Sequence, residues 1–444
     1  MPLNLSIIAL SKFDTKTVLD NADVLNLWNI AGYSAGICYM PEDYFTSDKC
    51  TIENNIKRFG NCVDNGHQSV ADHAWIEIKL TGISKALAMW LNSLKFYVTS
   101  EKSARYTIMD ALYSEKYDKW REKGAEYIRQ ALPDHPDKQI EKMAAERARM
   151  MLDINAPMTT MAYSATLRQW NIIYDWCTHM REYWVGTYSS EHLPTFYAKL
   201  VNELEELAVN IKHMNILVDG LVDIKRCFPN AIMPPFPDGL QVFHCFPATE
   251  HKNEINFINP SSYSVQHLYV HHNTMIIGGY ATPAMLAQLQ RHRRLTVKMD
   301  FNDAHFVSIP CPFNGYSAKL DKEFKNEWTN DIEDIHKSGR IPIGVGIPFT
   351  CTGAPDDIYT MVVERCCGCA QKEIRDFACN VRDIFCESFP YTMDQLDVDA
   401  IYTWGDVVGK YERKIKQNQQ VLTRCSVCKC NNPCEWIKDP NYLF

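Results

Sequence analysis

The densest basic cluster of the sequence is the tetrapeptide Arg-His-Arg-Arg at positions 291–294. Arginine guanidinium groups match phosphate oxygens with paired hydrogen bonds, so one interpretation of this cluster is an anion site. The alternative is a helix C-terminus whose cations complement the helix dipole. Spacing alone favours the second interpretation.

Two segments nearer the N-terminus carry further polar groups. Segment 66–73 reads Gly-His-Gln-Ser-Val-Ala-Asp-His, and segment 101–106 reads Glu-Lys-Ser-Ala-Arg-Tyr. His67 and His73 stand six positions apart, a spacing that matches no helical pair of metal ligands. Taken alone, the first segment therefore indicates structural histidines and the second a solvated loop.

The C-terminal tail contains a dense group of thiols. Cys425, Cys428, Cys430 and Cys434 could together hold a structural zinc ion. Their spacing differs from the standard paired-knuckle pattern, so unliganded or redox-active thiols are the alternative. The chain has 17 cysteines, and because it shows no export signal we expect reduced thiols rather than a disulfide framework.

Composition limits the class of protein. A chain of 444 residues, 46% hydrophobic and 23% charged, has room for two or three domains with a sizeable core. The formal net charge of −8 argues against a general nucleic-acid coat protein. No apolar run approaches the ~20 residues of a membrane span, and the start lacks the basic region of a signal peptide. We therefore expect a cytoplasmic protein.

Alternation and capping signals predict the elements that position these groups. Ser84 follows a predicted strand and suits the N-cap of a helix, because its hydroxyl can accept a hydrogen bond from the first turn. Pro133 and Pro136 divide the Lys-, Glu-, Arg- and Ala-rich region 114–152 into helices. The predicted strands span residues 3–10, 74–80 and 272–277, and the predicted helices span 85–95, 166–181, 194–212 and a stretch that begins at Pro283.

The strand–turn–helix pattern occurs twice. Ser84 and Thr282 are 198 positions apart (282 − 84), and Pro283 suits the first helical position of the second copy. Further matches at the same offset and in the same order favour an internal duplication. We predict two homologous halves at 1–225 and 263–420, a Pro- and aromatic-rich linker at 226–262, and a Cys-rich tail at 421–444.

Together these motifs resemble the flavin-dependent thymidylate synthases (ThyX). That family has a Gly-His-x-(Ser/Thr)-x-x-Glu-His element, then Arg-His-Arg, a short spacer and Ser-x-Arg-Tyr. The resemblance covers about residues 25–180 and 265–385, and Asp72 stands where the pattern has Glu. It implies an α+β fold, with an antiparallel sheet and packed helices in each half. Family members are homotetramers whose sites lie between subunits, so a duplicated chain is expected to form a homodimer that imitates the tetramer.

The family signature is divided between the two halves. Half one keeps Glu101, Ser103, Arg105 and Tyr106 but lacks Arg-His-Arg, which half two keeps at 291–293. At the positions of the Glu, Ser and Arg, half two has Met299, Phe301 and Asp303.

Two further arginines follow the same alternation. Arg168 resembles a flavin-contacting arginine of the family, and its half-two counterpart is Asp356. Arg365 resembles a dUMP-binding arginine ahead of an Ala-Gln-x-Glu-Ile motif, and its half-one counterpart is Cys177. Each half thus lacks what the other keeps, which predicts one full site assembled from one half of each kind.

The resemblance implies roles for these positions. Arginines can offset the charge of the dUMP phosphate, and Gln288 lies one turn before Arg291 on the same helix face. The expected FAD-binding residues are His67, Ser69, Arg168, Arg291, His292 and Arg293. The expected dUMP-binding residues are Glu101, Ser103, Arg105, Tyr106, Arg149, Gln288, Arg291 and Arg365, of which Arg291, Arg365 and Ser103 are the candidate catalytic residues.

The implied reaction is methylene transfer from methylenetetrahydrofolate to dUMP, followed by reduction by flavin that NADPH recharges, giving dTMP. No cysteine nucleophile is implied, and the protein's part is to position the reactants and to supply electrostatics. One alternative is hydroxymethylation of dUMP or dCMP, in which water quenches the adduct. Another is a non-catalytic nucleotide-binding protein on a decayed scaffold, against which the complementary retention of residues argues.

Overall fold

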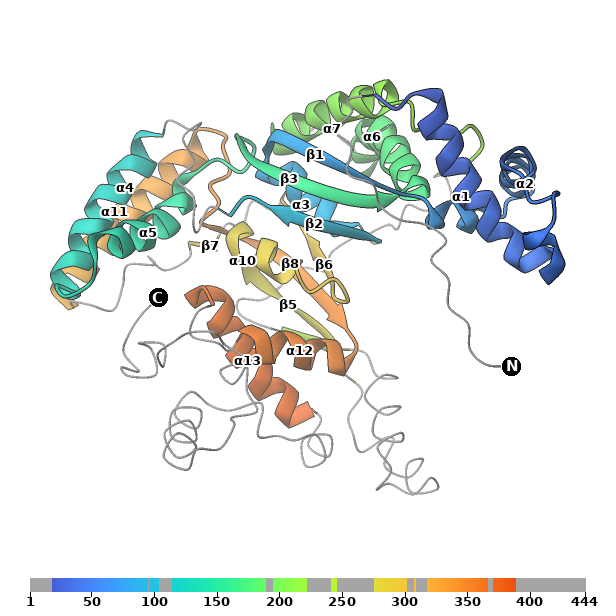
Figure 1. Cartoon of the computed structure of the whole chain (residues 1–444). Helices are drawn as coiled ribbons and strands as arrows, with labels where there is room; N and C mark the ends of the chain where they lie inside the picture. Colours follow the sequence, from blue (N-terminus) through green and yellow to red (C-terminus); the bar gives the residue numbers. More distant parts are fainter. Residues whose placement is uncertain are drawn as a thin grey trace, which may run out of the picture. The chain divides into compact units, whose positions relative to one another are not determined.

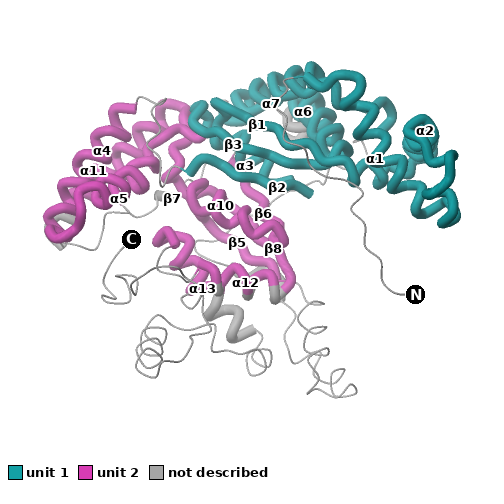
Figure 2. Tube along the Cα trace, viewed as in Figure 1, with its two compact units in different colours: residues 1–103, 155–231 teal, residues 104–154, 232–444 magenta. Residues whose placement is uncertain are grey.

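The computed structural model describes residues 18–94, 96–103, 114–188, 195–221, 241–245, 275–301, 307–308, 318–365 and 370–388. In this part of the chain the fold is α+β, with helices packed on antiparallel sheets (Figure 1). The chain divides into two compact units, coloured separately in Figure 2. The first consists of residues 1–103 and 155–231, and the second of residues 104–154 and 232–444.

The first unit is built on a three-stranded sheet in which β3 lies between β1 and β2, antiparallel to both. Its strands are β1 (Trp75–Ser84), β2 (Tyr97–Glu101) and β3 (Pro157–Thr166). Its helices are α1 (Asn21–Tyr39), α2 (Ile52–Asp64), α3 (Lys85–Ser93), α6 (Leu167–Tyr188) and α7 (Thr195–His213), with the 3-10 helices η1 (Glu42–Thr46) and η2 (Gln68–His73).

One face of this sheet forms the core of the first unit. Alternation places Ile78, Leu80, Tyr97 and Tyr163 on the buried face, and the rings of Tyr97 and Tyr163 stack with centroids 5.1 Å apart. Helices α3 and α6 contact β3, and α7 packs on both helices. The helices therefore cover the face on which these apolar side chains lie.

The second unit is built on the strand order β4-β5-β8-β6, with β7 also paired to β8. Its strands are β4 (Gln241–Cys245), β5 (Met275–Ala281), β6 (Thr296–Met299), β7 (Val307–Ser308) and β8 (Val345–Gly353). Its helices are α4 (Glu115–Ala131), α5 (Asp137–Ala148), α10 (Pro283–Leu289), α11 (Ala318–Lys337), α12 (Pro355–Arg365) and α13 (Lys372–Ser388), with the 3-10 helix η3 (Arg149–Met151).

The two units share a strand order and a capping arrangement. β1-β3-β2 in the first unit corresponds to β5-β8-β6 in the second, and in each trio the strand that comes last in the sequence lies between the other two. Ser84 caps α3, and its N–H and hydroxyl donate to the two carboxylate oxygens of Glu203 at 2.6 and 2.5 Å. Thr282 caps α10 and donates in the same way to Glu373, at 2.8 and 2.5 Å.

The elements predicted from the sequence can be compared where the structure describes them. The helix predicted at 194–212 is α7, the one predicted at 85–95 is α3, and the break at Pro133 and Pro136 separates α4 from α5. The predicted strand 3–10 lies outside the described residues. No helix of the described ranges is long and apolar enough to cross a membrane.

The division into units differs from the predicted halves in two places. Residues 104–154 belong to the second unit, although the sequence places them in half one. Strand β4 lies inside 226–262, which the sequence predicts as linker, and its backbone pairs with the otherwise open edge of β5.

Helices α4 and α11 join these two stretches of the second unit. The indole of Trp120 is fully buried against Trp328 and Phe324, with ring centroids 4.9 and 5.7 Å apart. Large aromatic side chains bury 150–250 Å² each, so this contact buries apolar surface between the two helices.

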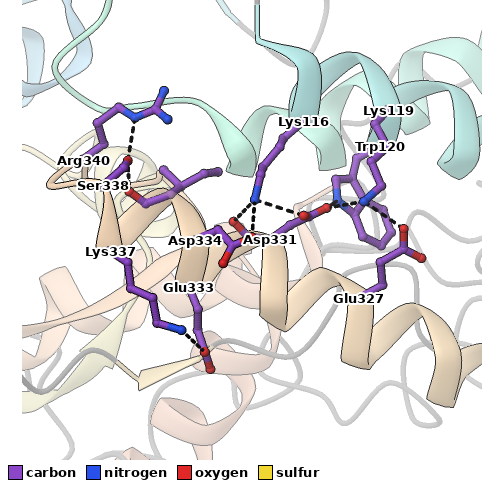
Figure 3. Close-up of polar contacts among 11 residues, drawn as sticks. Lys116, Lys119, Trp120, Glu327, Asp331, Glu333, Asp334, Lys337, Ser338 and Arg340 are labelled. Atoms are coloured by element: carbon purple, nitrogen blue, oxygen red, sulfur yellow. Dashed lines mark hydrogen bonds and ion pairs between the residues drawn. The ribbon is translucent and has the colours of Figure 1, made fainter.

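A row of ion pairs follows the same helix pair (Figure 3). The carboxylate of Asp331 accepts hydrogen bonds from Lys119 Nζ at 2.6 Å and Trp120 Nε1 at 2.9 Å, and lies 3.0 Å from Lys116 Nζ. Burial raises the pKa of Asp331, but the hydrogen bonds from Lys119, Lys116 and Trp120 outweigh it, so the pKa lies below its ordinary value. Hydrogen bonds from Lys119 and Lys123 likewise lower the pKa of Glu327.

This network of ion pairs predicts that the fold loses stability at acidic pH. Because the folded pKa of Asp331 is below its unfolded value, the carboxylate stabilises the fold above the unfolded pKa of about 4, and this contribution is lost as the pH falls through the lower, folded value. Asp331→Ala should lower the free energy of unfolding by roughly 1–3 kcal/mol at pH 7, because it removes the carboxylate that accepts the hydrogen bond of the buried Trp120 N–H.

Urea unfolding between pH 7 and pH 3 measures both effects. Glu333 is the matched control, because it pairs with Lys337 on the exposed side of the same helix at 3.2 Å. Glu333→Ala should change the free energy of unfolding by less than about 0.5 kcal/mol. Equal losses in the two variants would contradict the assignment.

Candidate active site

Four elements of the second unit bring predicted site residues together. Gln288 lies in α10, His292 in the turn that follows it, Arg365 at the end of α12, and Arg149 in η3. Gln371, directly before α13, completes the cluster. Four of these five residues were predicted from the sequence, and the structure adds Gln371.

The carboxamide of Gln371 links two predicted substrate-binding residues. Its Oε1 accepts a hydrogen bond from Arg149 Nη2 at 2.7 Å and another from Gln288 Nε2. Gln288 Nε2 also donates to the carbonyl of Ala284 at 3.2 Å. Gln288 Oε1 is buried and has no hydrogen-bond partner among the described residues. An acceptor of this kind is available to a donor on a bound molecule.

Arg365 and His292 form a second contact in this cluster. Arg365 Nε donates to His292 Nε2 at 2.8 Å, and Nη2 lies 3.5 Å from the carbonyl of Gln288. Since a guanidinium can only donate, His292 Nε2 accepts, and its Nδ1 lies 4.0 Å from Glu364 Oε2. The imidazole therefore fixes the plane of the guanidinium.

The local structure explains why these side chains meet. Thr282 begins α10, and Glu373 joins Thr282 to the start of α13, so Gln288 and Gln371 are held on adjoining helices. Burial raises the pKa of Glu373, which the hydrogen bonds from Thr282 and the charge of Arg149 partly offset. Arg149 thus lies near two groups at the start of α13, the amide of Gln371 directly before the helix and the Glu373 carboxyl in its first turn.

The rest of the basic cluster is exposed. Arg291 and Arg293 lie at the surface of the turn after α10, and Arg294 pairs with Asp357 at 3.0 Å. The cations follow the last residue of α10, as the helix C-terminus interpretation predicts, and the anion site stays a prediction.

The first unit holds Glu101 and Ser103 of the Glu-x-Ser-x-Arg-Tyr segment. Glu101 ends β2, and Ser103 follows it in a half-buried position. Glu101 Oε1 lies 2.6 Å from Lys85 Nζ and accepts a 3.3 Å hydrogen bond from Thr159 Oγ1. Arg105 and Tyr106 lie outside the described residues.

Arg168 opens α6 and contacts the residue that departs from the family pattern. Its Nη1 donates to Asp72 Oδ2 at 3.2 Å, and Asp72 Oδ1 accepts from Thr166 Oγ1 at 2.8 Å. Arg168 Nε is buried and has no hydrogen-bond partner in the part of the chain that the structure describes. His67 and Ser69 are exposed at and just after the start of η2.

The counterpart of Arg365 in the first half has different chemistry. Cys177 is buried in α6, and burial raises the pKa of its thiol. A protonated, buried thiol is neither a nucleophile nor a phosphate ligand. The first unit therefore lacks a cation at this position.

The predicted residues fall into two groups. Arg149, Gln288, Arg291, His292, Arg293 and Arg365 lie in the second unit, and His67, Ser69, Glu101, Ser103 and Arg168 lie in the first. The predicted zinc ligands Cys425, Cys428, Cys430 and Cys434 lie outside the described residues. Within the described residues no group of three or more His, Cys, Asp or Glu side chains could hold a metal ion.

The chemistry of the donors suits an anionic, planar ligand. Guanidinium groups bind phosphate oxygens, and carboxamides such as that of Gln288 can pair with both the donors and the acceptors of a pyrimidine edge. The unpartnered Arg168 Nε and Gln288 Oε1 are two of the described atoms that a bound flavin or nucleotide could satisfy.

Comparison with known families is consistent with this chemistry. Residues 26–184 match the family described as thymidylate synthase complementing protein. The matched span begins in α1 and ends in α6, so it includes Arg149 and Arg168 but ends before the cluster at 288–293. No curated protein matches the chain.

Proposed function

We propose that the chain methylates dUMP to dTMP, because residues 26–184 match the family described as thymidylate synthase complementing protein, that of the flavin-dependent thymidylate synthases. The methyl carbon would come from methylenetetrahydrofolate, with FAD as cofactor and NADPH as reductant. The observation that carries the proposal is the convergence of Arg149 and Gln288 on Gln371, beside the pair of Arg365 and His292.

The substrate would use the donors of this cluster. Arg365 and Arg291 would offset the phosphate charge, which is close to −2, and the Gln288 carboxamide would pair with the edge of the uracil. Arg149 holds Gln371, and through it Gln288, so it acts on the orientation of the amide as well as on the local charge. Bound flavin supplies the hydride chemistry, and Arg168, His292 and Arg293 are the residues that would hold it.

The proposal includes a tandem duplication with contributions from both halves of the sequence. It is supported by the common strand order and by the matching bonds of Ser84 to Glu203 and of Thr282 to Glu373. Arg149 is the clearest case of a shared contribution, since it precedes β3 in the chain and yet contacts Gln371 of the second unit. We further propose that two chains form a homodimer.

Mass spectrometry of the product tests the function. Purified protein reconstituted with FAD is incubated with dUMP, methylenetetrahydrofolate and NADPH, and the nucleotide is analysed. A product heavier than dUMP by one CH₂ group supports the proposal. A hydroxymethyl product would assign the alternative chemistry. A properly folded protein that takes up no FAD and leaves dUMP unchanged would overturn the enzyme assignment.

A further inference from the structure

A polar cluster in the first unit surrounds the end of β2. Lys85 Nζ lies 2.6 Å from Glu101 Oε1, and the two side chains are only 17% and 3% exposed. Thr159 Oγ1 contacts the same carboxylate at 3.3 Å and the carbonyl of Lys102 at 3.4 Å. The N–H of Lys102 donates to the carbonyl of Thr160 at 2.8 Å. These contacts hold the chain where it leaves the sheet toward Ser103.

The backbone of the second unit repeats this exit from the sheet. Glu101 pairs with Met161 of β3, and Met299 pairs with Phe349 of β8. The next residue donates its N–H to the central strand in both units, Lys102 to Thr160 at 2.8 Å and Asp300 to Pro348 at 3.0 Å. The register therefore makes Met299 the structural counterpart of Glu101.

The side chains of the two clusters differ completely. Lys85 follows the N-cap Ser84, as Pro283 follows the N-cap Thr282. Thr159 precedes Met161 by two residues, as Ile347 precedes Phe349. The polar set Lys85, Glu101 and Thr159 thus stands where the second unit has Pro283, Met299 and Ile347.

The contrast between the two units indicates whether the polar set is needed for the fold or for function. The apolar set shows that the backbone can leave the sheet in this way without any buried charge. A buried ion pair is often no more stabilising than apolar residues of similar volume, whereas loss of one partner leaves an uncompensated charge. The unit that carries Ser103 has the polar set nonetheless.

We infer that Lys85 is a positioning residue, which holds Glu101 and thereby fixes segment 101–103 so that the Ser103 hydroxyl is presented to the nucleotide. This inference rests on the proposed function for the identity of the ligand. Lys85 and Thr159 set the orientation of Glu101, and Lys85 itself does not contact the substrate.

The test uses the full chain with FAD and two measurements, amide hydrogen exchange at Lys102 and steady-state kinetics with dUMP. Lys85→Met should speed exchange at Lys102 and raise the KM for dUMP, each about tenfold, with kcat changed less than about twofold. Lys85→Arg should restore both values, because it keeps the charge near Glu101. Lys79→Met is the matched control, because Lys79 is an exposed lysine of β1 in the same unit, and it should change neither value.

Other outcomes overturn the inference. Unchanged exchange in Lys85→Met, or faster exchange with an unchanged KM, means that Lys85 does not position the segment. If Lys85→Met fails to fold, the double variant Lys85→Met/Glu101→Gln removes both charges, and a wild-type KM in it would equally refute the role. If the wild type does not act on dUMP, the proposed function fails, and the exchange rates alone decide whether Lys85 holds segment 101–103.

Discussion

Replacement of Arg365 by alanine is expected to reduce kcat/KM for dUMP by a hundredfold or more. The variant removes a guanidinium whose plane is set by the 2.8 Å bond to His292, and with it the N–H groups that would bind the nucleotide. Donors held in place before the reaction are worth about 10²–10³ in rate when one is removed. It also removes the donor of the hydrogen bond that His292 Nε2 accepts.

Steady-state kinetics and dUMP titration, with circular dichroism to verify folding, measure this effect. Arg294→Ala is the matched control, because Arg294 belongs to the same basic cluster but is 75% exposed at its side chain and pairs with Asp357. It removes the same charge and should change kcat/KM by less than about threefold. If Arg294→Ala proved as harmful as Arg365→Ala, general electrostatic attraction and not a defined contact would explain the cluster.

Arg168→Ala is expected to weaken FAD binding by about tenfold to a hundredfold. One charge-assisted hydrogen bond contributes roughly 1.5–3 kcal/mol, and the loss of Arg168 also leaves Asp72 as an unpaired anion beside a ligand that carries a pyrophosphate. The two effects have the same sign, so the variant should release flavin on gel filtration and lose the absorbance of the bound, oxidised cofactor.

The control for this variant lies on the same helix. Arg181 of α6 pairs with Glu205 at 2.8 Å and is about half exposed, so Arg181→Ala removes an arginine and an ion pair from α6 at a different place. The flavin content of Arg181→Ala should match that of the wild type. Normal flavin content in a folded Arg168→Ala protein would remove Arg168 from the cofactor site.

The sequence predicts the helices of this fold better than its central strands. Ser84, Thr282 and Pro283 mark helix starts by local chemistry, and the structure has helices at both places. β3 and β8 were not predicted, although Met161, Tyr163 and Ala165 of β3 alternate with less buried residues. Small and hydroxyl-bearing residues between them weaken the apolar contrast on which a strand prediction depends.

The sequence likewise predicts some residues of the candidate site and misses the contacts that orient them. The motifs predict Gln288, Arg149 and Arg365, and the structure brings the first two together on Gln371. The partner that holds α10 beside α13 is not predictable from the sequence, because Glu373 is 91 positions from Thr282 and no local rule joins them. The ion pair of Lys85 and Glu101 was also missed, since it depends on how β2 returns beside the start of α3.

In each unit the middle strand of the sheet leaves the ribosome after both of its neighbours. β3 lies between β1 and β2, and it is separated from β2 in the chain by the helices α4 and α5. The ladder of the first unit therefore cannot form until residue 166 has been synthesised, and by then residues that pack in the second unit have already emerged. Pairings that close such long loops form slowly and leave strand edges open in the meantime. Helices α4 and α5 are synthesised long before α11, so they lack this packing partner until about residue 337 has been added. Elements that pack together in the second unit are therefore not synthesised one after another.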